Sequence, residues 1–107
     1  MTTTEDPDLS IAVHVDGPDR VVRLAGELDL NSAPALRACL ADLDDSLHIV
    51  VDMTDLSFMS SSGISVLIGA YKQRATRDGT IILRNPRGTV ARVLTLTGVD
   101  QVLTIEP

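Results

Sequence analysis

Three consecutive serines and a glycine, Ser60 to Gly63, form the segment with the most obvious capacity for chemistry. An apolar stretch with helical spacing follows directly, so a hydroxyl here can accept hydrogen bonds from the free N–H groups of a helical first turn. The same position also tolerates a phosphate ester, because the positive end of a helix dipole favours added negative charge. Helix capping and reversible phosphorylation are therefore two interpretations of this segment, and Gly63 would permit close packing in either.

Nucleophilic catalysis by a serine would need a base, and the two histidines are badly placed to act as one. His14 and His48 both lie in predicted strands, and four strand residues separate His48 from the end that carries the serines, about 13 Å at roughly 3.3 Å per residue. Both are interpreted as ordinary strand residues, and Cys39 as a small core hydrophobe. We expect no catalytic residue and no enzyme, although Asp29 or Asp55 would be the base in the remaining enzymatic hypothesis.

Composition excludes several classes of partner. The 107 residues carry a net charge of −6 without a Lys/Arg cluster, and Phe58 and Tyr71 are the only aromatic residues, so nucleic acid is not expected to bind. The most apolar stretch, 64–71, is far below the roughly 20 residues that span a bilayer, which predicts a cytoplasmic protein without direct membrane insertion. Glycine-rich phosphate loops and H-E-x-x-H are missing, so we expect neither a cofactor nor a metal.

The first half of the chain contains the elements that would support one side of a site. Apolar residues alternate with polar ones over 9–15 and 21–28, which predicts an antiparallel hairpin closed by the turn signal at 16–19. Helical spacing then predicts a helix from Ala33 to Asp45, with Ser32 as its N-cap.

The second half alternates strand and helix. The apolar run 48–52 is typical of a central strand covered on both faces, and 53–59 is interpreted as irregular, with Asp52 ending the strand and Asp55 in the loop. A helix from Ser62 to the stop at Gly79 is expected to turn one polar face to solvent, formed by Lys72, Gln73, Arg74 and Arg77. The remaining predictions are a strand over 80–83, a helix over 87–97 capped at Asn85–Pro86 and ended by Gly98, and a strand over 101–105.

Helical crossovers between strands indicate an α/β fold with a mostly parallel sheet and an antiparallel N-terminal strand at its edge. Loops that follow parallel strands meet at one edge of the sheet, so the segments 28–31, 52–62 and 84–88 are expected to converge. We expect one domain over 9–107, preceded by a flexible tail over 1–8. Leu67 and Val50 are predicted core residues.

Two motifs in this order resemble the STAS domain family over nearly the whole chain. They are Gly26-Glu27-Leu28-Asp29 and the segment from Val50-Val51-Asp52-Met53 through Ser60-Ser61-Ser62-Gly63 to Ile68. The resemblance implies a STAS-like (βα) superhelix with four or five strands and three or four helices. It also implies an anti-sigma factor antagonist: unphosphorylated, such a protein binds an anti-sigma factor and frees the sigma factor. That anti-sigma factor is a serine kinase of the histidine-kinase-like ATPase type, which phosphorylates the antagonist and ends binding, and a metal-dependent PP2C-type serine phosphatase reverses the modification.

The family pattern Asp-Ser-Ser-Gly places the modified serine at Ser61, with Ser60 standing where the family has aspartate. Ser60 and Ser62 are the alternative acceptors, because each offers a hydroxyl one residue away. The partner-binding residues implied by the resemblance are Asp29, Asn31, Ser60, Ser61, Ser62 and Gly63. A second hypothesis is a cytosolic accessory subunit of an ABC-type membrane transporter, and a further option in the family is nucleotide binding.

Overall fold

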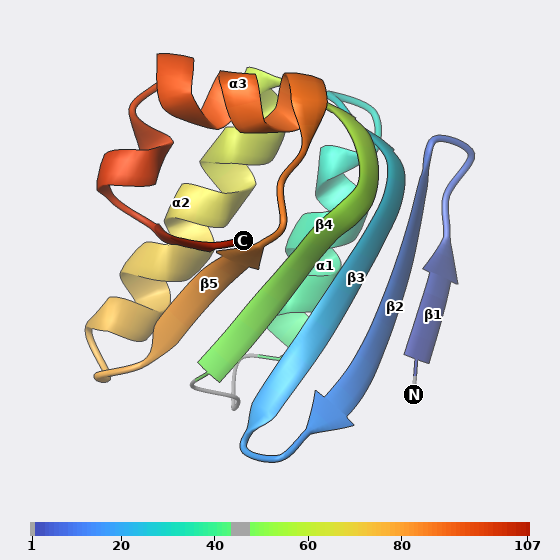
Figure 1. The fold of residues 1–107 in the computed structure, drawn as a ribbon. Helices are drawn as coiled ribbons and strands as arrows, with labels where there is room; N and C mark the ends of the chain where they lie inside the picture. The colour runs from blue at the N-terminus through green and yellow to red at the C-terminus, as the bar shows by residue number, and fades with distance from the viewer. Residues whose placement is uncertain (1, 44–47) are drawn as a thin grey trace.

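The computed structural model describes residues 2–43 and 48–107 and contains one six-stranded sheet in the order β1-β2-β3-β4-β5-β6 (Figure 1). The strands are β1 (Thr2–Glu5), β2 (Leu9–Asp16), β3 (Asp19–Leu28), β4 (His48–Met59), β5 (Thr80–Arg84) and β6 (Thr104–Glu106). The helices are α1 (Ala33–Asp42), α2 (Ser61–Ala75), α3 (Gly88–Leu96) and the short 3-10 helix η1 (Val99–Gln101).

The pairing of the strands confirms the predicted α/β fold. β1, β2 and β3 pair antiparallel, and β3, β4, β5 and β6 pair parallel through helical crossovers. The sheet has six strands rather than four or five, because Thr2–Glu5, inside the predicted tail, pairs with β2 in a register that places Thr4 opposite Ile11. Threonine is β-branched and favours extended backbone, so this short polar segment suits an edge strand.

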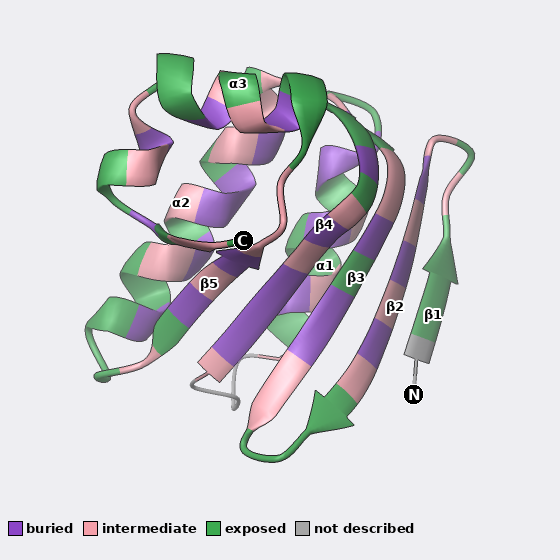
Figure 2. Cartoon of the chain, viewed as in Figure 1, coloured by how far each residue is buried: buried purple, intermediate pink, exposed green. Residues whose placement is uncertain are grey.

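The main core lies between the sheet and the helices. In Figure 1, α1 and α2 lie behind the strands and α3 crosses their upper end. Alternate strand residues such as Ile11, Leu24 and Val51 point to this side and pack with Leu36 and Leu67, all of them fully buried. The alternation is visible along β2, β3 and β4 in Figure 2.

The other face of β4 lacks the helical cover that its apolar run predicted. No helix among the described residues lies in front of the sheet in Figure 1, although Val50 is buried as expected, at 3% exposure. Val50 is in register with Val21 on β3 and with Ile82 on β5. Cross-strand neighbours on the same face therefore contribute to its burial.

β4 is longer than the sequence predicts, and the prediction of an irregular segment over 53–59 is wrong. The strand continues to Met59, so Asp52 does not end it and Asp55 lies within it. Pairing with β3 shifts register between Arg23 and Ala25 and again between Gly26 and Glu27. Such irregularities bend a strand pair and break strict alternation, which explains why the polar residues here resembled a loop.

Arg74 was predicted on a solvated face and is instead fully buried. Its guanidinium donates hydrogen bonds to the carbonyls of Leu40, at 3.4 Å, and Leu43, at 3.0 Å, at the end of α1. Those carbonyls belong to the last turn of a helix, where intrahelical donors run out. α1 ends at Asp42, three residues earlier than predicted, and Asp45 lies outside the described residues.

The C-terminal elements differ in detail from the prediction. Asn85 does not cap α3: it has a φ of 52°, its N–H donates to the Glu106 carbonyl, and the N-cap is Arg87. After Gly98, at a φ of 79°, the chain forms η1 before β6 begins at Thr104. Across the described ranges, no helix is both long and apolar enough to cross a membrane.

Candidate functional site

The three serines lie where β4 ends and α2 begins, and the structure gives each hydroxyl a different environment. The Ser60 N–H donates to the Leu28 carbonyl at 2.9 Å, which fixes this turn against the end of β3. Ser61 is the first residue of α2 and is exposed, whereas Ser62 is half-buried. The Ser60 hydroxyl is buried and has no hydrogen-bond partner among the described residues, so the capping interpretation is wrong for Ser60.

Gly63 is required by packing. A Cβ at this position would lie 2.6 Å from Cγ of Leu28 and 3.1 Å from Cγ of Met59, both of which are fully buried. The first turn of α2 therefore rests directly on the ends of β3 and β4. This contact holds Ser61 at the rim of the core with its side chain outside it.

The loop after β3 is organised by Asp29, and Ser32 is the N-cap residue of α1, as predicted, although without a side-chain cap bond. Oδ1 of Asp29 accepts hydrogen bonds from the N–H groups of Asn31 and Ser32, both at 3.0 Å. The Ser32 hydroxyl makes no cap bond; it donates to the Glu27 carbonyl at 2.8 Å and accepts from the Asp29 N–H at 2.9 Å. The pKa of Asp29 is lowered, chiefly by the hydrogen bond from the Ser32 N–H and further by that from the Asn31 N–H.

The Asp29 loop and the serine segment form adjacent walls of one hollow. Its volume is about 250 Å³, and its lining residues are Leu30, Ala33, Pro34, Arg37, Ser62 and Ser65. Leu30, at 73% exposure, projects from the loop. The predicted convergence of 28–31 with the serine segment is therefore confirmed.

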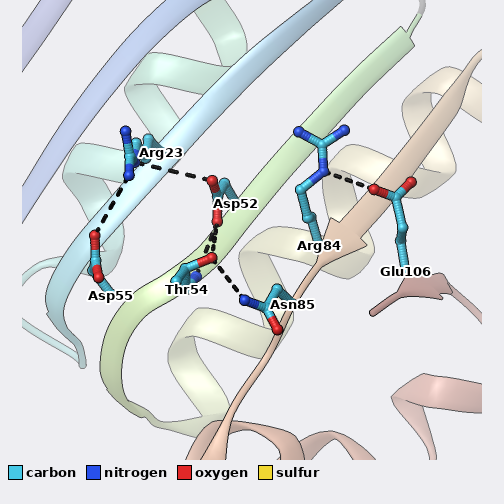
Figure 3. A network of polar contacts seen from close by, with 7 residues as sticks. All are labelled: Arg23, Asp52, Thr54, Asp55, Arg84, Asn85 and Glu106. Carbon is cyan, nitrogen blue, oxygen red and sulfur yellow. Dashed lines mark hydrogen bonds and ion pairs between the residues drawn. The ribbon is translucent and has the colours of Figure 1, made fainter.

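The third predicted loop, 84–88, contacts β4 at a point that precedes the serine segment in the chain. The Asn85 side-chain amide donates to the Thr54 hydroxyl at 3.0 Å, and Thr54 donates to Asp52 at 2.6 Å (Figure 3). Partial burial raises the pKa of Asp52, but hydrogen bonds from Thr54 and the charges of Arg23 and Arg84 outweigh it, and the net pKa is lowered. Asp52 thus connects strands and loop and lies apart from the serine segment.

Charges alternate across four neighbouring strands on the helix-free face. The register aligns Arg23, Asp52, Arg84 and Glu106 on β3, β4, β5 and β6. Figure 3 shows Arg23 between Asp52 and Asp55, at 3.9 and 3.8 Å, and Arg84 beside Glu106 at 2.7 Å. These cross-strand pairs tie the parallel strands together, a structural role.

Three carboxylates lie close together at the Asp29 loop, although the sequence predicts no metal site. Oxygens of Asp8, Glu27 and Asp29 lie within 4.8 Å of one another and have the chemistry to hold a cation. Asp8 approaches because the Glu27 N–H donates to its carbonyl at 2.8 Å, and Gly26, with a φ of 108°, leaves room for that carbonyl. The sequence signal for this approach was Gly26, at the start of the first motif.

The histidines lie far from this rim along their strands. His48 begins β4, at the opposite end from Ser60, and its Nδ1 lies 2.9 Å from the Thr80 hydroxyl. His14 lies in β2. Asp8 and Arg37 were not expected in this region, because the close approach of Asp8 and the packing of α1 against α2 are not apparent from the sequence.

The fold and this rim define a class: small α/β domains that present an exposed helix start and an acidic loop at the carboxyl ends of parallel strands. The model of the STAS domain family matches residues 10–107, and the chain belongs to this family.

Relatives and solved structures agree with this membership. The anti-sigma-B factor antagonist of Bacillus subtilis (strain 168) is 29% identical over 92% of this chain and 91% of its own length. A crystal structure of an anti-sigma factor antagonist from Mycobacterium paratuberculosis has a TM-score of 0.81 at 27% identity, covering 97% of this chain and 91% of that one. The Bacillus protein SpoIIAA, at 27% identity over 91% of this chain, matches with TM-scores of 0.79 unphosphorylated and 0.71 phosphorylated, covering 88% and 91% of those chains.

Proposed function

We propose that this chain is an anti-sigma factor antagonist that switches partners when Ser61 is phosphorylated. The unmodified protein binds an anti-sigma factor and so frees the sigma factor. The phosphorylated protein releases the anti-sigma factor. The observation that carries the proposal is the exposed Ser61 side chain beside the Asp29 loop in a member of this family. Relatives named as antagonists, and a related protein solved in both phosphorylation states, support it.

Burial favours Ser61 among the three hydroxyls as the proposed acceptor. A kinase must bring the γ-phosphate of ATP in line with the acceptor oxygen, which requires an accessible side chain. Ser61 meets this condition, the Ser60 hydroxyl is buried, and Ser62 is half-buried beside α1. In the transfer, the Ser61 oxygen forms a bond to the γ-phosphorus, the bond to the β-phosphate oxygen breaks, ADP leaves and the hydroxyl proton is released.

The fold is well placed to accept the product. The first turn of α2 contains no acidic residue, and its N-cap makes no side-chain hydrogen bond. A phosphate at Ser61 therefore meets the positive end of the helix without a neighbouring carboxylate on that turn. Because the acceptor lies outside the core, the added charge alters the surface and leaves the packing of the domain in place.

The docking surface that we propose surrounds Ser61. It combines the Asp29 loop, including Asn31 and the exposed Leu30, with the start of α2. Phosphorylation takes the formal charge from −6 to about −8 at that place. The bulk and the charge of the phosphate would together weaken binding of the anti-sigma factor.

The function implies further components. The anti-sigma factor is expected to be the kinase, of the histidine-kinase-like ATPase type, and a PP2C-type phosphatase is expected to remove the phosphate. The protein itself acts as a regulatory binding protein and as a substrate, and the cycle takes place in the cytoplasm. It requires no cofactor bound to this chain.

A pull-down from the source cytoplasm followed by reconstitution tests the proposal. Tagged protein is used as bait, a captured anti-sigma factor is purified, and the two are incubated with ATP before intact-mass and peptide analysis. We expect one added phosphate at Ser61, with dissociation of the complex. Ser61→Ala is expected to bind without being modified, and Ser62→Ala, one residue away, to behave like wild type.

Two outcomes would overturn the proposal. One is capture of an ATP-binding cassette subunit in place of an anti-sigma factor, which would favour the transporter hypothesis. The other is an anti-sigma complex that neither modifies Ser61 nor weakens in ATP.

A further inference from the structure

One basic side chain of α1 lies directly across from the start of α2. Arg37 lines the hollow of about 250 Å³ together with Ser62 and Ser65, and it also lines the adjoining hollow of about 160 Å³ between α1 and α2. In Figure 1 the two helices lie side by side behind the sheet. Arg37 is thus the cation on the wall that faces the serine segment.

Arg37 is exposed, and its guanidinium has no partner in the part of the chain that the structure describes. Within residues 2–43 and 48–107, no carboxylate lies within ion-pair distance of it and no hydrogen bond involves its side chain. The contrast is Arg74, whose buried guanidinium holds the end of α1. Toward the described residues, the donors of Arg37 therefore remain available for a phosphate.

Ser61 lies next to residues that line the same hollow. The Ser65 hydroxyl, which lines it, donates to the Ser61 carbonyl at 3.1 Å, and Ser62, the next residue after Ser61, lines it as well. Ser61 does not itself line the hollow, but an added phosphate lengthens its side chain, and Arg37 is a long side chain with five donors at its tip. Guanidinium and phosphate match in geometry and form paired, charge-assisted hydrogen bonds.

We propose that Arg37 pairs with the phosphate of modified Ser61 across the α1–α2 groove and so acts as a positioning residue for the phosphorylated state. This inference rests on the proposed function, because it assigns a role to the same modification. The pairing draws the phosphate against α1 and withdraws the Arg37 charge from the surface offered to a partner. Modification therefore changes Ser61 on the docking surface and Arg37 beside it.

The ionisation of the phosphate itself reports the pairing. Phosphoserine is introduced at position 61 during translation, so that no kinase is needed, and its second ionisation is followed by phosphorus NMR. An unpaired phosphoserine has this pKa at about 6, and a nearby guanidinium favours the dianion. We expect Arg37→Ala to raise the phosphate pKa by about 0.5 to 1 unit and Arg37→Lys to raise it by less.

A matched control and a stability measurement make the result decisive. Arg20→Ala, at the start of β3 and the other end of the strand from the site, is expected to leave the phosphate pKa unchanged. Arg37→Ala is expected to lower the melting temperature of the phosphorylated protein but not of the unmodified protein. An equal phosphate pKa in wild type and Arg37→Ala would overturn the inference, as would a larger effect of Arg37→Ala on phosphoserine at position 62.

The inference and the proposed function fail separately. If no anti-sigma factor modifies Ser61, the titration of the installed phosphate still shows whether Arg37 pairs with it. If the phosphate pKa is insensitive to Arg37, modification of Ser61 and release of the partner remain as proposed, and only the role of Arg37 is lost.

Discussion

Asp29 shows how one residue of the candidate site serves the fold as well. Its carboxylate gathers the N–H groups of Asn31 and Ser32, which would otherwise lack partners before α1 begins. The same carboxylate stands with Asp8 and Glu27 in an exposed acidic cluster. A substitution at Asp29 therefore changes both the shape of the loop and its charge.

The pH dependence of the loop follows from the lowered pKa of Asp29. A carboxyl whose pKa is lower in the folded protein stabilises it above the unfolded-state pKa, about 3.9, and this stabilisation is lost as the pH falls through the folded-state pKa. We expect the amide resonances of Asn31 and Ser32 to titrate together with a midpoint below about 3.9. Asp29→Asn should abolish that titration, and a midpoint above the ordinary value would contradict the assignment.

Gly63 and Gly69 lie on the same helix and make opposite predictions for alanine. A Cβ at Gly63 would overlap the buried Leu28 side chain, whereas a Cβ at Gly69 meets nothing within 4 Å. Gly63→Ala is expected to cost about 1 to 3 kcal/mol of unfolding free energy, and Gly69→Ala to stabilise by up to about 1 kcal/mol, in urea denaturation. Equal effects at both positions would show that the start of α2 is not tightly packed on β3.

At the scale of elements, the end of α1 depends on an arginine from α2. Replacing Arg74 with methionine keeps much of the length but removes the donors that reach the Leu40 and Leu43 carbonyls. We expect Arg74→Met to cost about 2 to 4 kcal/mol in urea denaturation, because buried carbonyls lose their donors. Lys72→Met, at an exposed position on the same helix, should stay within about 0.5 kcal/mol. A similar effect of both variants would mean that the buried hydrogen bonds of Arg74 contribute nothing to the free energy of unfolding.

The elements themselves were largely predictable, and the exceptions share a cause. Apolar periodicity located the hairpin, α2 and the parallel sheet, because those patterns report burial directly. It failed for β4 beyond Asp52, where register shifts break the alternation, and for Arg74, whose buried charge is satisfied by carbonyls distant in sequence. β1 was missed because an edge strand need not be apolar.

The candidate site was predictable only in outline. The topology rule brought the Asp29 loop to the serine segment, as the bond between Ser60 and Leu28 confirms. The rule could not place Arg37 on the facing wall, since that depends on how α1 and α2 pack. Nor could residue types alone show that the Ser60 hydroxyl is buried while Ser61 is exposed.

At the scale of the whole molecule, most of the buried core lies away from the proposed docking surface. The core between sheet and helices includes Leu67, which is fully buried, whereas Leu96 on α3 is 77% exposed. Leu67→Ala is expected to cost about 2 to 5 kcal/mol and Leu96→Ala less than about 0.5 kcal/mol in urea denaturation. Neither residue lies at the serine rim, so a Leu67→Ala protein that remains folded should bind its partner normally. Selective loss of binding in that folded variant would show that docking reaches further than proposed.

The most direct test of partner switching compares the affinity of one anti-sigma factor for two forms of this protein. Calorimetry with unmodified protein and with protein carrying phosphoserine at position 61 isolates the effect of the phosphate from that of the kinase. We predict that both forms are folded and that the phosphate weakens binding at least about tenfold, which is about 1.4 kcal/mol. Equal affinity of two folded forms would contradict the proposed switch.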